Sequence, residues 1–326
     1  MNEYILNAYK ILDGKDLSIE EALMLGSTEG ENVLDLSSLA FKVQQKYSKT
    51  FHLCTICNAK SGLCGEDCSY CAQSSFHSAD ISTYPLLSFD SILKQAEKTY
   101  SKGIRHFGIV TSGYGYKEIN DEFKNIVKII IELKKHFPDL EVCASLGVLS
   151  EETSKALAEA GISEYNHNIQ VNPEKYLSLV ATTHKVEERI ETIKFLKRYS
   201  VRVCSGGIIG LGETMEDRIK LAFLLKELNV DIVPLNVLIP IKGTRLENQK
   251  KTKAIEVIKT FALFRLILKD RVIKFAAGRE TIMKDFQGLI MLSGANGFLT
   301  GGYLTTRGRE PEEDKLFLEE LYEFQK

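Results

Sequence analysis

Short runs of β-branched and apolar residues recur along the chain, and most are followed by a stretch with helical periodicity. In residues 116–137, for example, six apolar side chains fall on one helical face: Ile119, Phe123, Ile126, Val127, Ile130 and Leu133. The pattern predicts strands that alternate with helices. The expected strands span residues 51–57, 104–110, 140–146, 163–169, 201–209, 230–239, 271–277 and 295–300.

Such an alternation predicts a parallel sheet whose strands are joined by crossover helices. Eight strands favour an α/β fold of the (β/α)8 TIM-barrel type, because a closed barrel has no edge strand. Residues 1–48 are instead typical of two or three short helices, one of them starting near Ser18. We therefore expect a helical N-terminal extension over residues 1–48 and one barrel domain over residues 49–326.

Charge and composition exclude several partners. The 326 residues include 42 basic and 44 acidic side chains, and a net charge of −2 gives no indication of nucleic-acid binding. The sequence has no secretory signal pattern, and no apolar run approaches the ~18 residues of a membrane span. We expect a cytoplasmic protein without membrane contact. Its seven cysteines then indicate metal ligands, redox groups or core residues rather than disulfides.

Five of these cysteines fall within residues 54–71. Cys64, Cys68 and Cys71 have the spacing C-x3-C-x2-C, which lets one loop hold three irons of a four-iron cube. The fourth iron then stays open for a small molecule with amino and carboxylate groups. This arrangement, with Tyr70 before the last cysteine, is similar to the radical S-adenosylmethionine (SAM) signature. It follows the first expected strand, at the face where barrel enzymes build active sites.

A structural zinc site is the alternative for this cluster. Cys54 with Cys57 and Cys68 with Cys71 form two C-x2-C pairs, the usual four-cysteine zinc pattern. Ten residues separate the pairs, which is shorter than the common spacing, and Cys64 is left over. The iron–sulfur interpretation is therefore favoured.

Further segments, in order along the chain, resemble the biotin synthase family of radical SAM enzymes. They are residues 58–62, 64–74, 165–168, 203–213, 233–236, 242–244, 277–280 and 294–296. The resemblance implies insertion of one sulfur between two unactivated carbons of dethiobiotin, with 5′-deoxyadenosyl radicals from two SAM molecules. It also implies a 4Fe–4S cluster, a flavodoxin- or ferredoxin-type electron donor and a homodimer.

The resemblance also assigns residues to SAM. These are Tyr70 and Ile208 near the adenine, Thr111, Ser112 and Gly113 near the amino group, Arg189 near the carboxylate, and Asn168 and Gln170 in the same site. The family usually has an acid where Gln170 stands, which changes one contact to the ribose. The ureido ring of dethiobiotin is neutral and suits carboxamides, so Asn166, Asn168 and Asn236 are the candidate substrate contacts. Ordinary turn asparagines are the alternative.

Better-known members of the family hold a second, 2Fe–2S cluster on three strand cysteines and one arginine. Two of these positions match Cys143 and Cys204, but the third falls at Phe107 and the arginine position at Lys274. Phenylalanine cannot bind iron. With two of four ligands changed, the usual 2Fe–2S site is not expected.

Cysteines on other strands suggest a replacement. Cys57, Cys143 and Cys204 lie on the first, third and fifth expected strands, and interior layers of a barrel take side chains from alternate strands. We predict that these three, with Cys54 as a further candidate, hold an auxiliary cluster in which four irons are favoured over two. The alternative is that Cys143 and Cys204 are small core residues.

Two rival functions stay open. A maturase or mutase of the same radical SAM subgroup would keep the C-x3-C-x2-C loop but would not need cysteines on the third and fifth strands. A non-catalytic zinc or iron–sulfur electron carrier would need neither a SAM pocket nor an eight-stranded barrel. Turnover of dethiobiotin separates the first rival, and cleavage of SAM separates the second.

Overall fold

The computed structural model describes residues 2–302, 304 and 308–326. The strands are β1 (His52–Lys60), β2 (His106–Thr111), β3 (Gly115–Tyr116), β4 (Glu141–Ser145), β5 (Val148–Leu149), β6 (Glu164–Asn166), β7 (Arg202–Cys204), β8 (Gly207–Ile209), β9 (Ile232–Val237), β10 (Val272–Phe275) and β11 (Gly297–Leu299). The helices are α1 (Glu3–Ala8), α2 (Ile19–Gly26), α3 (Asn32–Tyr47), α4 (Phe89–Ser101), α5 (Asp121–His136), α6 (Glu151–Glu159), α7 (Tyr176–Leu179), α8 (Val186–Arg198), α9 (Met215–Glu227), α10 (Ala254–Ile267), α11 (Gln287–Met291) and α12 (Pro311–Glu323).

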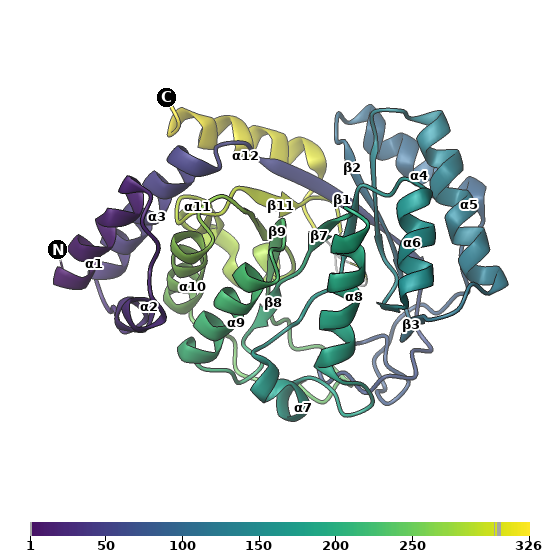
Figure 1. Ribbon diagram of the computed structural model, residues 1–326, viewed down its shortest axis with the longest axis horizontal. Coiled ribbons are helices and arrows are strands. Elements are labelled where there is room, and N and C mark those ends of the chain that lie inside the picture. Colours follow the sequence, from purple (N-terminus) through teal and green to yellow (C-terminus); the bar gives the residue numbers. More distant parts are fainter. Residues whose placement is uncertain (1, 303, 305–307) are drawn as a thin grey trace.

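A closed parallel barrel forms the centre of the molecule. Its strands follow the order β1, β2, β4, β6, β7, β9, β10 and β11, and β11 pairs back with β1 (Figure 1). β8 follows β7 after two residues and pairs with β9, so both belong to the single run expected at 201–209. The predicted eight-stranded barrel is confirmed.

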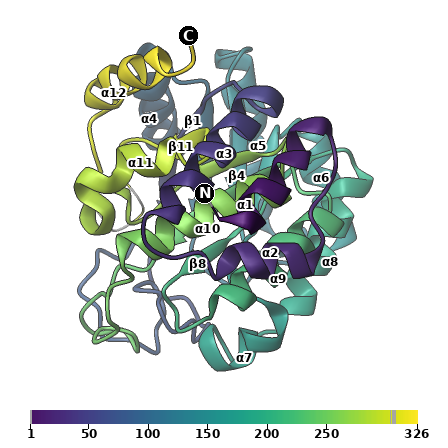
Figure 2. The same cartoon turned by 90° about the vertical axis from the view of Figure 1, so that its left-hand side faces the viewer.

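The N-terminal helices lie outside the barrel. Figure 2 shows α1, α2 and α3 in front of α10; α2 contacts α9 and α10, and α3 contacts α10. The predicted helix start near Ser18 is correct, because Ser18 and Glu21 form a reciprocal capping box at the start of α2. The boundary at residue 48 stays a prediction.

One expected helix begins later than its apolar pattern suggested. The pattern ran from residue 116, but α5 starts at Asp121, because the Asn120 side chain accepts a hydrogen bond from the Phe123 amide at 2.8 Å. Ile119 therefore precedes the helix. Residues 115 and 116 instead form β3, which pairs with β5.

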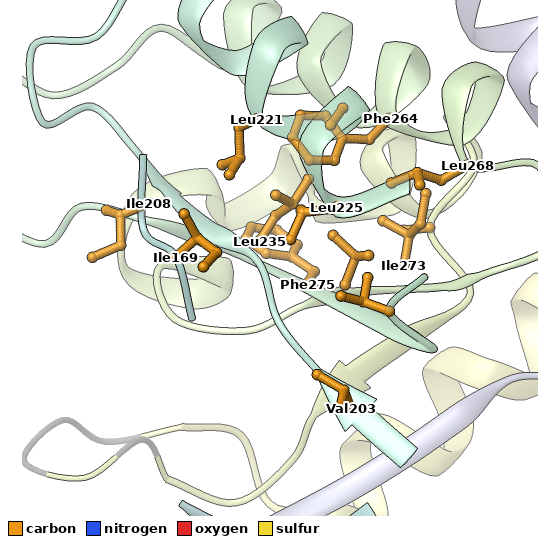
Figure 3. Packing of buried hydrophobic residues seen from close by; sticks show 14 of the residues in the cluster. Ile169, Val203, Ile208, Leu221, Leu225, Leu235, Phe264, Leu268, Ile273 and Phe275 are labelled. Atoms are coloured by element: carbon orange, nitrogen blue, oxygen red, sulfur yellow. The ribbon is translucent and has the colours of Figure 1, made fainter. Parts of the chain in front are cut away.

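The main apolar core lies between the strands and the surrounding helices. Figure 3 shows one part of it, where side chains of α9 and α10 pack against side chains of β9 and β10. A fully buried Phe or Leu of this kind stabilises the fold by about 1.5–3 kcal/mol. No helix of the described residues is long and apolar enough to cross a membrane.

A buried arginine anchors the last barrel strand. Arg265 of α10 is fully buried, and it donates hydrogen bonds to the Gly294 carbonyl (2.7 Å) and to Asn296 Oδ1 (2.6 Å). These acceptors offset the cost of removing a charge from water. The same Asn296 oxygen accepts from the Ile273 amide at 2.9 Å, which joins the start of β11 to β10.

Candidate active site

A cavity of about 260 Å³ lies inside the barrel, and two groups of cysteines line it. The loop cysteines, Cys64, Cys68 and Cys71, belong to the connection between β1 and α4. The strand cysteines, Cys54, Cys143 and Cys204, belong to β1, β4 and β7. Thiols that are far apart in the sequence therefore line the same cavity.

The loop that carries the first group is fixed to the segment before α8. The Ser69 amide donates to the Val180 carbonyl at 2.8 Å, and Asp67 accepts from the Thr182 amide and hydroxyl at 2.8 and 2.6 Å. Although burial opposes ionisation, these bonds and those from Thr183 hold the pKa of Asp67 well below its usual range. The Asp67 carboxylate thus holds the loop in place through its hydrogen bonds to Thr182 and Thr183.

The loop cysteines form a compact set of soft ligands. Burial raises the pKa of Cys68 to about 12 and that of Cys71 to about 11, while the positive charge of Arg189 opposes the rise. Such thiols keep their protons in the free protein and lose them when metal binds. Three thiols on one loop, beside a cavity, fit a four-iron cluster with one open iron.

Cys54, Cys143 and Cys204 face inward from the first, third and fifth barrel strands. Lys274 lines the same cavity from β10, the seventh barrel strand. Its Nζ lies 3.5 Å from Cys54 Sγ. The four residues form the layer of alternate strands that the barrel geometry predicts.

Cys57 does not belong to this group. It is fully buried among apolar residues and is absent from the cavity lining, because residues three apart on a strand point to opposite faces. Its neighbour in register on β2, Ile109, is likewise absent from the lining. The prediction that Cys57 joins Cys143 and Cys204 is therefore wrong, and Cys54 takes its place.

A second prediction that the structure corrects concerns β2. Phe107 is buried in the apolar core, whereas Gly108 lines the cavity and lies in register with Cys143. The assignment of the altered ligand position to Phe107 is therefore wrong by one residue, which reverses the face of the strand. At the cavity-facing position β2 offers no side chain at all.

Comparisons with known proteins agree with this geometry. Residues 59–225 match the model of the radical SAM superfamily, and residues 234–322 match that of the biotin and thiamin synthesis associated domain. A biotin synthase of Pelodictyon phaeoclathratiforme is 54% identical, with 99% of this chain and 98% of the relative covered. A biotin synthase of Chlorobaculum tepidum is 51% identical, with 98% and 97% covered.

The chain belongs to the biotin synthase family.

Two solved structures of low sequence identity share the fold. Methylornithine synthase superposes with a TM-score of 0.84 at 19% identity, covering 96% of this chain and 95% of that one. The hydrogenase maturase HydG of Carboxydothermus hydrogenoformans gives 0.81 at 17% identity, covering 98% and 78%. At such identities the likeness concerns the barrel alone.

Most residues that the family resemblance assigned to SAM line the cavity near the loop cysteines. These are Tyr70, Thr111, Ser112, Gly113, Asn168, Gln170 and Arg189. Ile208 does not: it is buried on β8, beside a smaller pocket that Gln170 also lines. The role of each residue toward SAM stays a prediction.

Gln170, where the family usually has an acid, has an unusual conformation. Its φ of 76° lies in the left-handed region, and its Nε2 donates to the Tyr70 hydroxyl at 2.7 Å. Its buried Oε1 has no partner among the described residues. An amide oxygen of this kind can accept a hydrogen bond from a ligand hydroxyl, as a carboxylate would.

The three candidate substrate asparagines also line the cavity, but their partners differ: Asn236 and Asn168 contact backbone groups, whereas the partners of Asn166 are the side chains of Ser145, Asn168 and Cys204. Asn236 binds two backbone groups, the Gly207 carbonyl at 3.2 Å and the Ala277 amide at 3.0 Å. Asn168 Oδ1 accepts from the Gly206 amide at 3.0 Å. Asn166 instead donates to Cys204 Sγ at 3.3 Å. Asn166 thus connects the strand cysteines to the middle of the cavity.

Sequence reasoning missed His184. Its Nδ1 lies 2.7 Å from Glu66 Oε2 of the cysteine loop, and its Nε2 lies 2.8 Å from the Tyr176 hydroxyl and 3.0 Å from Arg189 Nη2. A neutral imidazole with the proton on Nδ1 satisfies all of these partners. His184 therefore links Glu66 of the cysteine loop to Arg189. Glu66 is distant from both in the sequence, and only the folded barrel brings it beside His184.

Sequence reasoning also missed a charged group at the inner end of the cavity. Glu164 of β6 is 2% exposed and lies 3.1 Å from both His52 Nε2 and an Arg202 nitrogen. Although burial opposes ionisation, His52 and Lys274 hold the pKa of Glu164 well below its usual range. Burial lowers the pKa of His52 and takes that of His106 to about 3, so both imidazoles are neutral.

Proposed function

We propose that this chain converts dethiobiotin to biotin by radical sulfur insertion, with two clusters bound at the two cysteine groups. The observation that carries this proposal is the single cavity that both groups line. A substrate in that cavity would have a radical source at one end and a sulfur source at the other. The full-length relatives named biotin synthase support the same reaction.

The loop cysteines would hold a 4Fe–4S cluster, with SAM at its open iron. When bound, these groups supply the 5′-deoxyadenosyl radical that removes hydrogen from unactivated carbons. The chain itself orients SAM and keeps water out. Arg189 is half-buried, and its Nη1 donates to the Asn168 carbonyl at 3.0 Å, so its charge is held at the cavity wall for a carboxylate.

The strand cysteines, Cys54, Cys143 and Cys204, would hold an auxiliary cluster that supplies the sulfur, and we favour four irons over two. Three thiols leave one iron of a cube free for an exchangeable sulfide. Two features support the larger cluster. Gly108 provides no ligand at the cavity-facing position of β2, so the layer offers three thiolates rather than the usual set of four ligands. Lys274 stands where the family's 2Fe–2S site uses arginine.

Asn166 is the substrate contact that we favour. Its amide lies beside Cys204, where carbon and sulfur must meet, and a neutral ureido ring is matched by a carboxamide without the cost of burying a charge. Asn168 and Asn236 would shape the same wall, where backbone groups fix their side chains, whereas the Asn166 side chain has only side-chain partners among the described residues. Loss of the Asn166 amide should therefore affect substrate binding most.

We further propose a flavodoxin- or ferredoxin-type electron donor, a homodimer and a cytoplasmic location. Reductive cleavage of SAM needs a low-potential electron that the chain does not make itself. A reducing compartment keeps seven free cysteines available for metal. Size-exclusion chromatography with light scattering measures the oligomeric state directly.

The test is turnover of anaerobically reconstituted protein with SAM, a low-potential reductant and dethiobiotin. We expect biotin, together with two 5′-deoxyadenosines for each biotin formed. Formation of 5′-deoxyadenosine without biotin, in protein whose strand cysteines carry iron, would contradict the proposal and favour a maturase- or mutase-type reaction. Absence of both products with an intact loop cluster would contradict radical SAM chemistry itself.

A further inference from the structure

The fourth member of the strand layer is a lysine with unused hydrogen-bond donors. Lys274 is 4% exposed and lines the cavity together with the strand cysteines. Among the described residues its Nζ has one hydrogen-bond partner, Cys54 Sγ at 3.5 Å. An ammonium carries three N–H donors, so two are left for a group in the cavity.

Glu164 connects this ammonium to the inner end of the barrel. Its Oε2 lies 3.8 Å from Lys274 Nζ and 3.8 Å from Cys143 Sγ. Its Oε1 lies 3.1 Å from an Arg202 nitrogen. One carboxylate oxygen therefore faces the strand layer, and the other faces the inner end. The distance of 3.8 Å is too long for a direct hydrogen bond, so Glu164 leaves the donors of Lys274 free.

The charges do not balance without a ligand. Lys274 and Arg202 are basic and both lie within 4 Å of Glu164, so two basic side chains face one carboxylate at this end of the cavity. The Glu164 carboxylate lies 3.8 Å from Lys274 Nζ, and an opposite charge at this distance favours the ammonium form of the amine. An ammonium has no lone pair and cannot bind iron. Its position suits an anion formed by thiolates and sulfide.

We propose that Lys274 is a positioning residue for the auxiliary cluster: its ammonium donates hydrogen bonds to the cluster's sulfur atoms and balances their negative charge, while Glu164 fixes the ammonium from behind. The inference rests on the proposed function, because it requires a cluster on the strand cysteines. It adds an electrostatic role for two residues that ligate no metal.

The proposal makes two predictions of opposite sign. A buried positive charge beside a cluster favours the reduced state, and so does each N–H···S hydrogen bond. Replacing Lys274 by methionine should therefore shift the midpoint potential to more negative values. Replacing Glu164 by glutamine removes a buried negative charge, so the potential should shift to more positive values. A general loosening of the fold would not produce opposite shifts.

The experiment uses full-length protein in which the loop cysteines are all alanine, so that only the auxiliary cluster contributes. Lys274→Met, Lys274→Arg and Glu164→Gln are added separately. Iron and sulfide per chain are measured first, and the midpoint potential follows from a redox titration monitored by EPR. We expect a negative shift for Lys274→Met, a positive shift for Glu164→Gln and a near-parental value for Lys274→Arg.

The outcomes separate the two proposals. A parent without iron overturns the proposed auxiliary cluster and this inference with it. A parent with a cluster whose potential is unchanged by Lys274→Met, or shifts in the same direction in Lys274→Met and Glu164→Gln, overturns the inference alone. If Lys274→Met fails to hold iron, Lys274→Arg decides: retention of the cluster supports a role for the charge, and loss contradicts it.

Discussion

The two cysteine groups that line the cavity are built in opposite ways. The loop cysteines, Cys64, Cys68 and Cys71, lie within eight residues of sequence, and hydrogen bonds to the segment before α8 hold their loop. The strand cysteines come from three strands and span residues 54–204. The first group is defined by spacing, whereas the second exists only because the barrel closes.

This difference separates a site that a local motif can specify from one that depends on the whole barrel. The loop group needs only a short motif and an anchor, and it lies in the part of the chain that matches the radical SAM superfamily. The strand group depends on which face of each strand carries a thiol. A change of one residue, as at Gly108, alters the ligand set without altering the fold.

The largest effect is expected from the loop group. Cys68→Ala should lower 5′-deoxyadenosine formation by more than about 1000-fold, because the cofactor carries out a step that no side chain can perform. Iron at the strand cysteines should remain. Chromatography of the reaction and iron analysis measure both quantities. Appreciable SAM cleavage by the variant would contradict the assignment of the loop.

A change in the strand group should separate cleavage of SAM from formation of biotin. Cys143→Ala should abolish biotin formation while 5′-deoxyadenosine is still produced, and its iron content should fall to that of one cluster. Cys57→Ala is the matched control, since Cys57 faces away from the cavity. It should keep all iron and lose about 1 kcal/mol of stability, as measured by chemical unfolding. Loss of iron in the Cys57 variant alone would reverse the assignment.

A smaller effect is expected at the link between the cysteine loop and Arg189. His184→Phe leaves buried donors of Tyr176 and Arg189 without an acceptor, which costs about 1–3 kcal/mol. The dissociation constant for SAM should rise about tenfold, equivalent to about 1.4 kcal/mol. The EPR signal of the auxiliary cluster should not change. His136→Phe, at an exposed histidine, is the control and should leave SAM binding unaltered.

The smallest effect is expected at Gln170. Gln170→Glu keeps an acceptor at the position of the unpartnered Oε1 and adds a negative charge. SAM should therefore bind about two- to fivefold more tightly, a gain in binding free energy of less than about 1.4 kcal/mol. Equilibrium binding of SAM to reconstituted protein measures the change. If Gln170→Ala binds SAM as well as the natural chain does, Gln170 makes no contact with the ligand.

The sequence was sufficient for the barrel and for the loop group, because alternation and spacing are local properties. The sequence was insufficient where a shift of one residue decides which face of a strand carries a side chain or where a helix begins. Cys54 and Cys57 share a strand but not a face, and Phe107 and Gly108 differ in the same way. The start of α5 depended on the cap at Asn120 rather than on the apolar pattern.

The contacts of Lys274 with Cys54 and Glu164 had no local signal at all. The residues belong to β10, β1 and β6, and the closed barrel alone brings their side chains within 4 Å. The same is true of His184 and Glu66, which are 118 residues apart in the chain. Sequence patterns therefore located all the cavity-lining cysteines of the loop group, and for the strand group they placed Cys57 where Cys54 lies.

The central claim is that the chain holds two clusters, one at each cysteine group. The most direct measurement is anomalous X-ray diffraction at the iron edge, on crystals grown anaerobically from reconstituted protein. We predict two iron positions, one beside Cys64, Cys68 and Cys71 and a second among Cys54, Cys143 and Cys204 near Lys274. A single iron position at the loop, with the strand thiols free, would contradict the account.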